Sequence, residues 1–424
     1  MPEIIPFRGI LYNSELLKSA DALICPPYDV ISTELQHQLY ADSPYNAIRL
    51  ELPIEVDPYT AAASLLQLWL QEKKLVKDSN AAIYPYFQTF NDSDGKSHTR
   101  CGFFAAMRLH EFTEKKILPH EKTLSGPKTD RLNLFRTTKA NISPIFGLYA
   151  DEEKITDTLL RSFTDVNEPV IDALFHGVRN RMWRITDTEL IATLQESLLQ
   201  RTLYIADGHH RYETGVNYRN ECAAANSSHT GDEPYNFILT YCANIYDEGL
   251  IIFPIHRLVH SLDRFDSMEL KSQLEKFFTV TELHDRKALN AFLDNQHSSY
   301  AYGVVTSSMV LGICLNTDVL SLVDPMRSAA MQKLGLVLLH DLVLGRILGI
   351  SQDAMAKQSN LIYVKDDQEV FEAVASGKVQ VGFLVKPTTV EQVVAVSDMG
   401  EVMPQKSTFF YPKLMTGLLF NMLY

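Results

Sequence analysis

The segment LYIADGHHRYETG, residues 203–215, combines an apolar run with a tight turn and a cluster of polar side chains. The apolar run predicts a strand, Asp207 and Gly208 predict a turn, and the residues from His209 onward predict a helix. Glycine permits close approach of the backbone, and the first turn of a helix offers N–H groups to an anion. This strand–turn–helix is therefore a candidate phosphate site.

The side chains of this turn could bind a phosphate group and act on it. The residues concerned are Asp207, Gly208, His209, His210 and Arg211. The histidines and the arginine supply donors and positive charge, and the aspartate could hold hydrated Mg²⁺ or orient a hydroxyl group. The alternative is an ordinary helix start whose aspartate caps the turn and whose histidines face solvent or satisfy one another. A zinc site is disfavoured, because adjacent histidines rarely reach one metal and no H-E-x-x-H motif is present.

A second segment, LPHEKTLSGPKTDRL at residues 118–132, places a carboxylate among cations. Glu121 is followed directly by Lys122, and Lys128 and Arg131 come later. A catalytic base must lie near the hydroxyl that it deprotonates, while cations neutralise a phosphoryl group in transfer. Glu121 is therefore a candidate base, although a solvated charged loop explains this segment equally well.

The segment GEVMPQKS, residues 400–407, matches the P-loop pattern at its first glycine and at Lys406 and Ser407. Gln405 replaces the second glycine, and Pro404 lacks an N–H that the phosphate cradle needs. We therefore reject a P-loop. Lys406 and Ser407 could still line a site, although a basic turn in a structural tail is equally plausible.

Two signals are weaker. Tyr28 and Asp29, in CPPYDVIS, could contact a ligand, but a rigid turn is the commoner explanation of such a sequence. Lys413, in FFYPK, has the same standing as Lys406.

The composition is that of a globular protein, with 46% hydrophobic and 21% charged residues in 424. The formal net charge of −13 disfavours a broad grip on nucleic acid. No apolar run is long enough to span a bilayer, and MPEIIPFRGILYN lacks the features of a signal peptide. The five cysteines are scattered, with no C-x-x-C pair. We expect a reduced cytoplasmic protein with a small-molecule partner; the oligomeric state is not predicted.

The regular elements that would position these residues can be predicted in part. AAIYPYFQTF and RCGFFAAMRL predict a hairpin around Asp94-Gly95, and residues 60–72 predict a helix with Thr60 as a candidate cap. CPPYDVIS and YNAIRLELP predict extended runs that meet a turn. SPIFGLYA and NFILTYCANI predict strands.

The last third of the chain mixes helices and strands. Helices are expected near residues 267–278 and 329–348, and strands at 300–306 and 380–385. The apolar stretch LGLVLLHDLVLGRILGI contains three charged or titratable residues, so it predicts an amphipathic or buried helix of a soluble protein.

These segments, in this order, are those of a known family. PFRGILYN, CPPYDVIS, YNAIRLELP, PHEKT, GPKTDRL, PIFGLYAD, ADGHHRYET and MPQKSTFFYPK identify the whole chain as a member of domain of unknown function family 1015. The family label implies no established activity.

The DGHHRYE motif after a strand also resembles the partition-protein-B/sulfiredoxin-like fold, especially its free serine kinase branch. That resemblance implies an α+β fold with such a core and large N- and C-terminal α/β elaborations. The regions would be an N-terminal α+β region at 1–115, the core at 116–260 with PHEKT and DGHHR, and a C-terminal α/β region at 261–424.

The resemblance implies that a PHE-type segment supplies a catalytic glutamate and that the DGHHR turn binds phosphate. Glu121 would then be catalytic together with Asp207, His209 and His210. Phosphate or nucleotide would be bound by a set of cationic and small residues: Lys122, Lys128, Arg131, Gly208, Arg211, Lys406 and Ser407. Glu121 and Asp207 lie 86 residues apart in this sequence. This spacing departs from that of the free serine kinase branch, because a long insertion separates the two segments.

The expected function is therefore a nucleotide-dependent phosphotransferase that uses ATP or ADP and Mg²⁺ on a small hydroxylated metabolite, with L-serine as the first candidate. One alternative is a phosphate-ester hydrolase or nuclease on the same fold. The other is a nucleotide-sensing or nucleic-acid-binding regulator, although nucleic acid is disfavoured by the charge. The kinase mechanism requires residues 118–131 to meet residues 207–211.

Overall fold

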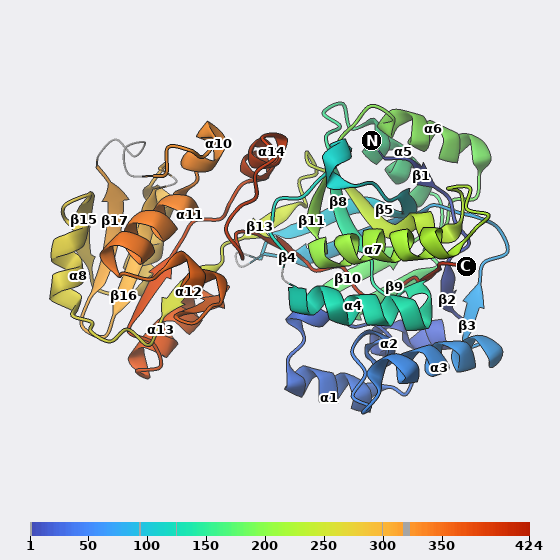
Figure 1. The fold of residues 1–424 in the computed structure, drawn as a ribbon, viewed down its shortest axis with the longest axis horizontal. Coiled ribbons are helices and arrows are strands. Elements are labelled where there is room, and N and C mark those ends of the chain that lie inside the picture. The colour runs from blue at the N-terminus through green and yellow to red at the C-terminus, as the bar shows by residue number, and fades with distance from the viewer. Residues whose placement is uncertain (1, 93–94, 124, 299, 317–322) are drawn as a thin grey trace. The chain divides into compact units, whose positions relative to one another are not determined.

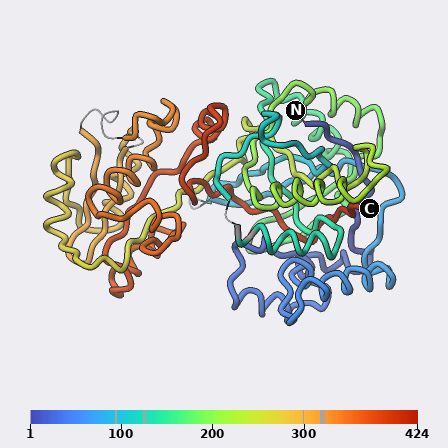
Figure 2. Tube along the Cα trace, in the orientation of Figure 1, coloured from blue at the N-terminus to red at the C-terminus, as the bar shows by residue number. Residues whose placement is uncertain are grey.

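The computed structural model describes residues 2–92, 95–123, 125–298, 300–316 and 323–424, without the side chains of Ser125 and Pro127. The chain forms two compact units (Figures 1 and 2). The first unit comprises Met1–Pro119, Thr123–Ile251 and Pro412–Tyr424, and the second comprises His120–Lys122 and Ile252–Tyr411. The predicted division into three regions at residues 115 and 260 stays a prediction.

Among the described residues, nine strands form the large mixed sheet of the first unit. In spatial order they are β6 (Ile117–Leu118), β11 (Leu203–Asp207), β8 (Ile145–Tyr149), β12 (Phe237–Asn244), β5 (Ser97–Arg108), β4 (Tyr84–Asn91), β10 (Val178–Met182) and β9 (Ile171–Phe175), with β1 (Ile4–Ile5) beside β5. The sheet is mixed because β8 is parallel to β12 and antiparallel to β11. The pairing of β4 with β5 confirms the predicted hairpin, while Asp94 lies outside the described residues.

Helices bury apolar side chains in two clusters of the first unit. One cluster contains core residues of the sheet together with Leu160 of α5 (Ile155–Thr164), Leu194 of α6 (Thr188–Leu198) and Tyr212 of α7 (His209–Ala225). The other surrounds Trp69 and includes side chains of α1 (Thr33–Asp42), α2 (Ile48–Glu51) and α3 (Pro58–Gln71), drawn in blue in Figure 1. The helix α4 (Ser125–Thr138) packs against both α3 and α7 and so connects the two clusters.

Two predicted elements of the N-terminal region need correction. The helix predicted at 60–72 is α3, but its cap is Asp57, whose side chain accepts from the Thr60 N–H, and not Thr60 itself. The prediction of an extended run in YNAIRLELP was wrong, because α2 occupies its centre. The Asn46 side chain accepts from the Ile48 N–H at 2.9 Å and donates to two carbonyl groups, so local capping starts a helical turn there.

The second unit contains an antiparallel six-stranded sheet within its described residues. Its strands, in spatial order, are β15 (Phe278–Leu283), β17 (Val310–Leu315), β16 (Ala301–Thr306), β19 (Val381–Leu384), β14 (His256–Val259) and β18 (Leu361–Val364). Its helices are α8 (Ser267–Leu274), α9 (Arg286–Asn295), α10 (Ala329–Gln332), α11 (Gly335–Leu338), α12 (Gln352–Ala356), α13 (Asp367–Ala375) and α14 (Val390–Asp398). Leu289, Val370 and Val374 from α9 and α13 pack on Val305 and Leu384 of the sheet.

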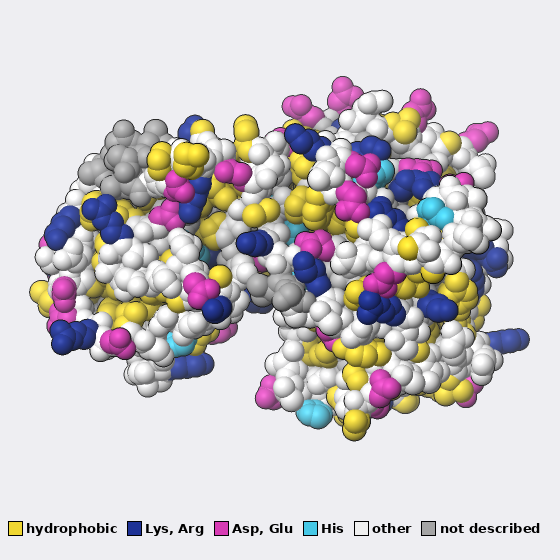
Figure 3. Space-filling model, viewed as in Figure 1, with side chains coloured by type: hydrophobic (Ala, Val, Ile, Leu, Met, Phe, Trp, Pro, Cys, Tyr) yellow, Lys and Arg dark blue, Asp and Glu magenta, His cyan; other side chains and the backbone are white. Residues whose placement is uncertain are grey.

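The stretch predicted as a buried helix begins as α11 and continues as a π-helix at Leu339–Ile347. It buries Val337 and Leu342 and also His340, whose role is described below. No helix in the described part of the chain is long and apolar enough to cross a membrane. On the face drawn in Figure 3, acidic and basic side chains are interspersed over the first unit.

Candidate functional site

The DGHHR turn has the predicted local structure, since β11 ends at Asp207 and α7 begins at His209. Gly208 between them has a φ of +88°, and a Cβ atom there would lie 2.8 Å from Ile145 Cγ2 and 3.1 Å from Arg211 Nε. A glycine is therefore needed for the backbone conformation and for the close approach. As the N-cap residue it has no side chain to cover the first turn of α7.

Asp207 is held by two cations. Its Oδ2 atom accepts from Arg211 Nη2 at 2.7 Å, and its Oδ1 atom accepts from Lys413 Nζ. Burial alone would raise the pKa of Asp207, but the charges of Lys413 and Arg211 outweigh burial and hold it well below its usual range. Asp207 is thus an anion at physiological pH, suited to orienting cations and unsuited to accepting a proton.

Arg211 is 4% exposed and has fixed partners. Its Nη1 atom donates to the Pro144 carbonyl oxygen, while Nη2 donates to Asp207. Burial lowers the pKa of Arg211, but the Asp207 carboxylate, followed by Asp29 and Glu51, outweighs burial and raises it. The guanidinium therefore stays charged. It has five N–H groups, so two such bonds leave donors for another acceptor.

Arg131 of α4 is a second buried cation, with 3% of its surface exposed. It donates to the Glu51 carbonyl oxygen at 3.0 Å and to Asp130 Oδ2 at 2.7 Å. Its Cζ atom lies 4.2 Å from the centre of the Tyr28 ring. Burial raises the pKa of Tyr28 to about 12, so its hydroxyl group remains a hydrogen-bond donor.

Glu51 is fully buried beside these cations. Its Oε1 atom accepts from Ser143 Oγ at 3.0 Å and lies 3.6 Å from Arg131 Nη1. Its Oε2 atom has no hydrogen-bond partner among the described residues. A buried acceptor without a donor is unfavourable, so this oxygen is a point of unrelieved polarity next to the buried cations.

We call this group the Asp207 cluster. It consists of Tyr28, Asp29, Glu51, Arg131, Asp207, Arg211 and Lys413, all in the first unit. Lys413 is anchored through its backbone, because its carbonyl oxygen accepts from Gln88 at 3.0 Å. His209 at the start of α7 is buried, and His210 is half-buried.

Lys128 of α4 forms an ion pair with a residue of the helix α7. Its Nζ atom donates to Glu213 Oε2 on α7 at 2.8 Å, and Thr123 Oγ1 donates to the other oxygen of Glu213 at 2.7 Å. The structure therefore brings Lys128 and Arg131 of GPKTDR to the same unit as the DGHHR turn. The contact α4–α7 positions both segments.

The donor set around Asp207 does not fit a magnesium ion bound directly by the protein. Both carboxylate oxygens already accept from cations, and a hard divalent ion needs several oxygen ligands. Within the described ranges, no group of three or more His, Cys, Asp or Glu side chains could hold a metal ion.

The PHEK segment belongs to the second unit. Glu121 pairs with Met403 as a parallel bridge, and the Glu121 Oε1 atom accepts from the Lys406 N–H at 3.3 Å. His120 is 1% exposed, and its Nε2 atom lies 2.8 Å from Thr408 Oγ1. Two predicted segments, PHEK and MPQKST, thus lie against each other.

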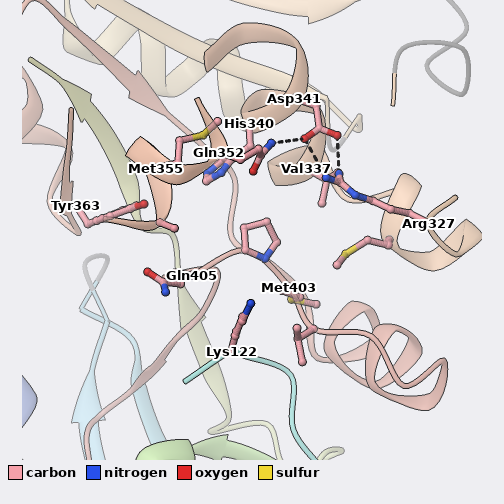
Figure 4. Close-up of a pocket in the computed structure, with 14 residues that line it drawn as sticks. Lys122, Arg327, Val337, His340, Asp341, Gln352, Met355, Tyr363, Met403 and Gln405 are labelled. Carbon is pink, nitrogen blue, oxygen red and sulfur yellow. Dashed lines mark hydrogen bonds and ion pairs between the residues drawn. The ribbon is translucent and has the colours of Figure 1, made fainter. Parts of the chain in front are cut away.

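Lys406 and Ser407 lie in a tight turn, and they have no P-loop conformation to cradle a phosphate. Lys406 has a φ of +56°, and the Ser407 hydroxyl donates to the Pro404 carbonyl oxygen. The exposed Lys122 lines a cavity of about 270 Å³ in the same unit (Figure 4). The roles predicted for Lys122, Lys406 and Ser407 in phosphate binding stay predictions, as does the contact of Glu121 with the DGHHR turn.

Glu51 is the site residue that sequence reasoning missed. The available signal was a carboxylate in the apolar run AIRLELP, where burial requires a compensating partner. Lys413, Tyr28 and Asp29 were only weak candidates in the sequence, and the structure places all three in the Asp207 cluster.

Comparison with solved structures gives distant resemblances. A free serine kinase in complex with AMP is 13% identical, with a TM-score of 0.36 over 73% of this chain and 86% of that chain. A conserved hypothetical protein from Pyrococcus furiosus is 13% identical, with a TM-score of 0.35 over 74% and 92%. SbnI from Staphylococcus aureus, with a C-terminal truncation, is 9% identical, with a TM-score of 0.34 over 74% and 85%. At these TM-scores the resemblances carry no argument about mechanism.

Comparison with protein families and curated sequences identifies the family of the chain. No curated protein matches the chain. The profile of the family described as "Protein of unknown function (DUF1015)" matches residues 4–335, which is most of the 424 residues. The chain therefore belongs to the DUF1015 family, as its sequence motifs predict.

Proposed function

We propose that this protein is a nucleotide-dependent phosphotransferase that acts on a small hydroxylated metabolite, with free L-serine as the first acceptor to test. One observation carries the proposal: six segments far apart in sequence converge on the Asp207 cluster. They contribute Tyr28–Asp29, Glu51, Arg131, Pro144, Asp207–Arg211 and Lys413. Such convergence on an ionic cluster at a helix start is typical of a ligand site.

The phosphates of the nucleotide would bind at the start of α7. Gly208 keeps the backbone accessible there, and Arg211 is already oriented by Pro144 and Asp207 before a ligand arrives. Donors fixed in advance stabilise developing charge without reorganisation. His209 and His210 would add donors, while Lys128 and Arg131 support the site from α4.

Asp207 would act by positioning Arg211 and Lys413. The general base in this proposal is Glu121, the carboxylate of the PHEK segment. The acceptor hydroxyl would give its proton to Glu121 while its oxygen bonds to the terminal phosphorus, and the bond from that phosphorus to the bridging oxygen of the nucleotide would break. Magnesium would enter with the nucleotide, held by its phosphates.

We also propose a partition-protein-B-like core within residues 116–260.

The test is nucleotide consumption followed by ³¹P NMR, with ATP or ADP, Mg²⁺ and a panel of hydroxylated metabolites that includes L-serine. We expect consumption only when an acceptor is present. Glu121→Gln should keep nucleotide binding and lower turnover by roughly 10²–10⁴-fold, the usual contribution of a general base. Lys378→Met, an exposed change in the second unit, is the control.

Other outcomes of the nucleotide-consumption assay would support one of the alternative functions. Consumption without any acceptor would favour a phosphate-ester hydrolase. Tight nucleotide binding without turnover would favour a nucleotide sensor. Equal turnover in Glu121→Gln would remove Glu121 from the role of base.

A further inference from the structure

The cavity of about 270 Å³ in the second unit has features of a separate ligand site (Figure 4). It uses none of the residues of the Asp207 cluster. Its walls come from the PHEK segment, from the π-helix, from α12 and from the residues before the Lys406 turn. The phosphotransferase mechanism proposed above assigns no step to this cavity, and Lys122, which the sequence predicts to bind phosphate, lies here among the residues of a separate cavity.

Lys122 supplies the charge that is available in this cavity. No hydrogen bond or ion pair joins its ammonium group to any residue that the structure describes, and Figure 4 draws it among the lining residues with Gln405 and Met403. Arg327 also lines the cavity, but Asp341 neutralises it through contacts of 2.5 and 3.1 Å. An anionic group on a ligand would therefore pair with Lys122.

Gln405 supplies an acceptor. Its Oε1 atom is buried and has no hydrogen-bond partner within the described part of the chain, although the side chain lines the cavity. Leaving such an oxygen without a donor is unfavourable, so a ligand hydroxyl group that reaches it would remove an existing penalty. This is the second independent sign of a ligand.

His340 adds no charge to the cavity wall. Burial, then the charges of Arg257 and Arg327, hold the pKa of His340 well below its usual range, and its Nε2 atom lies 3.3 Å from Arg257 Nε. Two charged residues outside the lining have opposite effects on the pKa of the lining residue Tyr363: Arg257 lowers it and Glu121 raises it. Their charges oppose each other there. The lining therefore carries a net charge of about +1, which matches a monoanion better than a dianion or a zwitterion.

The size and the apolar side chains limit the ligand further. At roughly 30 Å³ for each water-sized atom, the cavity holds about nine non-hydrogen atoms. Met331, Val337 and Met355 form an apolar part of the wall. We propose that this cavity binds a small aliphatic hydroxy monocarboxylate, with its carboxylate on Lys122 and its hydroxyl group donating to Gln405.

The experiment is titration calorimetry of the whole protein with 2-hydroxy-4-methylpentanoate, which has nine non-hydrogen atoms by its formula, on the order of the cavity's capacity. The comparison compounds each lack one feature: 4-methylpentanoate lacks the hydroxyl group, L-leucine replaces it with an ammonium group, and 4-methylpentane-1,2-diol lacks the carboxylate. We expect the hydroxy acid to bind best and the diol not to bind.

Two variants assign the contacts. Lys122→Met should weaken binding of the hydroxy acid by about tenfold or more, since it removes a charge-assisted hydrogen bond, while Lys378→Met should not change it. Gln405→Leu should abolish the preference for the hydroxy acid over 4-methylpentanoate. The proposal is overturned by no binding of the hydroxy acid, by equal binding in Lys122→Met, by stronger binding of L-leucine, or by Lys122-dependent binding of inorganic phosphate in its place.

Discussion

The Asp207 cluster of the first unit and the Lys122 cavity of the second unit use cations in opposite ways. In the cluster, Arg211 and Lys413 share the carboxylate of Asp207, and Arg131 lies against Asp130. In the cavity, the described residues provide no partner for Lys122. Paired, buried cations are part of the folded structure and are oriented in advance, whereas an exposed, unpaired cation is free to take its counterion from a ligand. We therefore expect substitutions in the Asp207 cluster to lower stability as well as ligand affinity, and substitution of Lys122 to lower ligand affinity with little loss of stability.

The largest loss of stability is expected for the substitution Asp207→Asn. Removing one partner of a buried ion pair leaves an uncompensated charge, and here we expect a loss of about 3 kcal/mol in the free energy of unfolding. Both tryptophans, Trp69 and Trp183, are buried in the first unit, so their fluorescence during urea unfolding reports on this unit. Asp172→Asn, which breaks the exposed pair with Arg179, is the control and should cost about 0–1 kcal/mol. Equal losses in the two variants would contradict the comparison.

The pH dependence of stability gives the same variant a second readout. The pKa of Asp207 is depressed in the folded protein, so its stabilisation is complete above the pKa of an unfolded aspartate, about 3.9. The stabilisation is lost as the pH falls below about 4 toward the folded pKa. Urea midpoints measured between about pH 6 and pH 3 should therefore fall more steeply for the wild type than for Asp207→Asn. Parallel curves would show that Asp207 is not held as an anion.

A smaller loss is expected for Gly208→Ala. The positive φ and the contact of 2.8 Å with Ile145 together should cost about 2–3 kcal/mol. Gly177→Ala is a matched control in the same unit, because Gly177 has a φ of +80° and a Cβ atom there would meet no other atom within 4 Å. It should therefore cost only about 1 kcal/mol. A difference near zero would mean that close approach is not what Gly208 provides.

The smallest change in stability is expected for Lys122→Met. An exposed lysine without a described partner contributes little, so the unfolding free energy should change by less than about 0.5 kcal/mol. Hydrogen exchange of peptides from the second unit measures this, because both tryptophans lie in the first. A loss as large as that of Asp207→Asn would show that Lys122 is structural and that the two units do not use their cations differently.

Local signals in the sequence were sufficient for several elements. The change from the apolar LYIA to Asp207-Gly208 predicts the end of β11 and the start of α7, because glycine and a following helix are encoded within a few residues. The hairpin β4–β5 is encoded in the same way by two strand-like runs around a turn. The helical turn α2 was missed because its start depends on hydrogen bonds from Asn46 to Ala22 and Ile24, more than twenty residues away.

Long-range contacts limit what could be predicted of the candidate site. Lys413 meets Asp207 across 206 residues, and no local pattern distinguishes it from other lysines in the tail. Glu51 was missed for the same reason, since its partners Arg131 and Ser143 come from distant segments. The DGHHR turn was predictable because its conformation and its chemistry lie in the same five residues.

The proposed function depends on the binding of nucleotide phosphates to the Asp207 cluster, and calorimetric titration with ATP and with ADP in the presence of Mg²⁺ measures that binding. Arg211→Ala should weaken nucleotide binding by about tenfold or more, because it removes a charged donor from the start of α7. Arg136→Ala is the control: Arg136 is exposed and pairs with Glu221, so this change should alter affinity by less than about twofold. Nucleotide binding that is equal in both variants and the wild type, or no binding to the folded wild type, would contradict the claim.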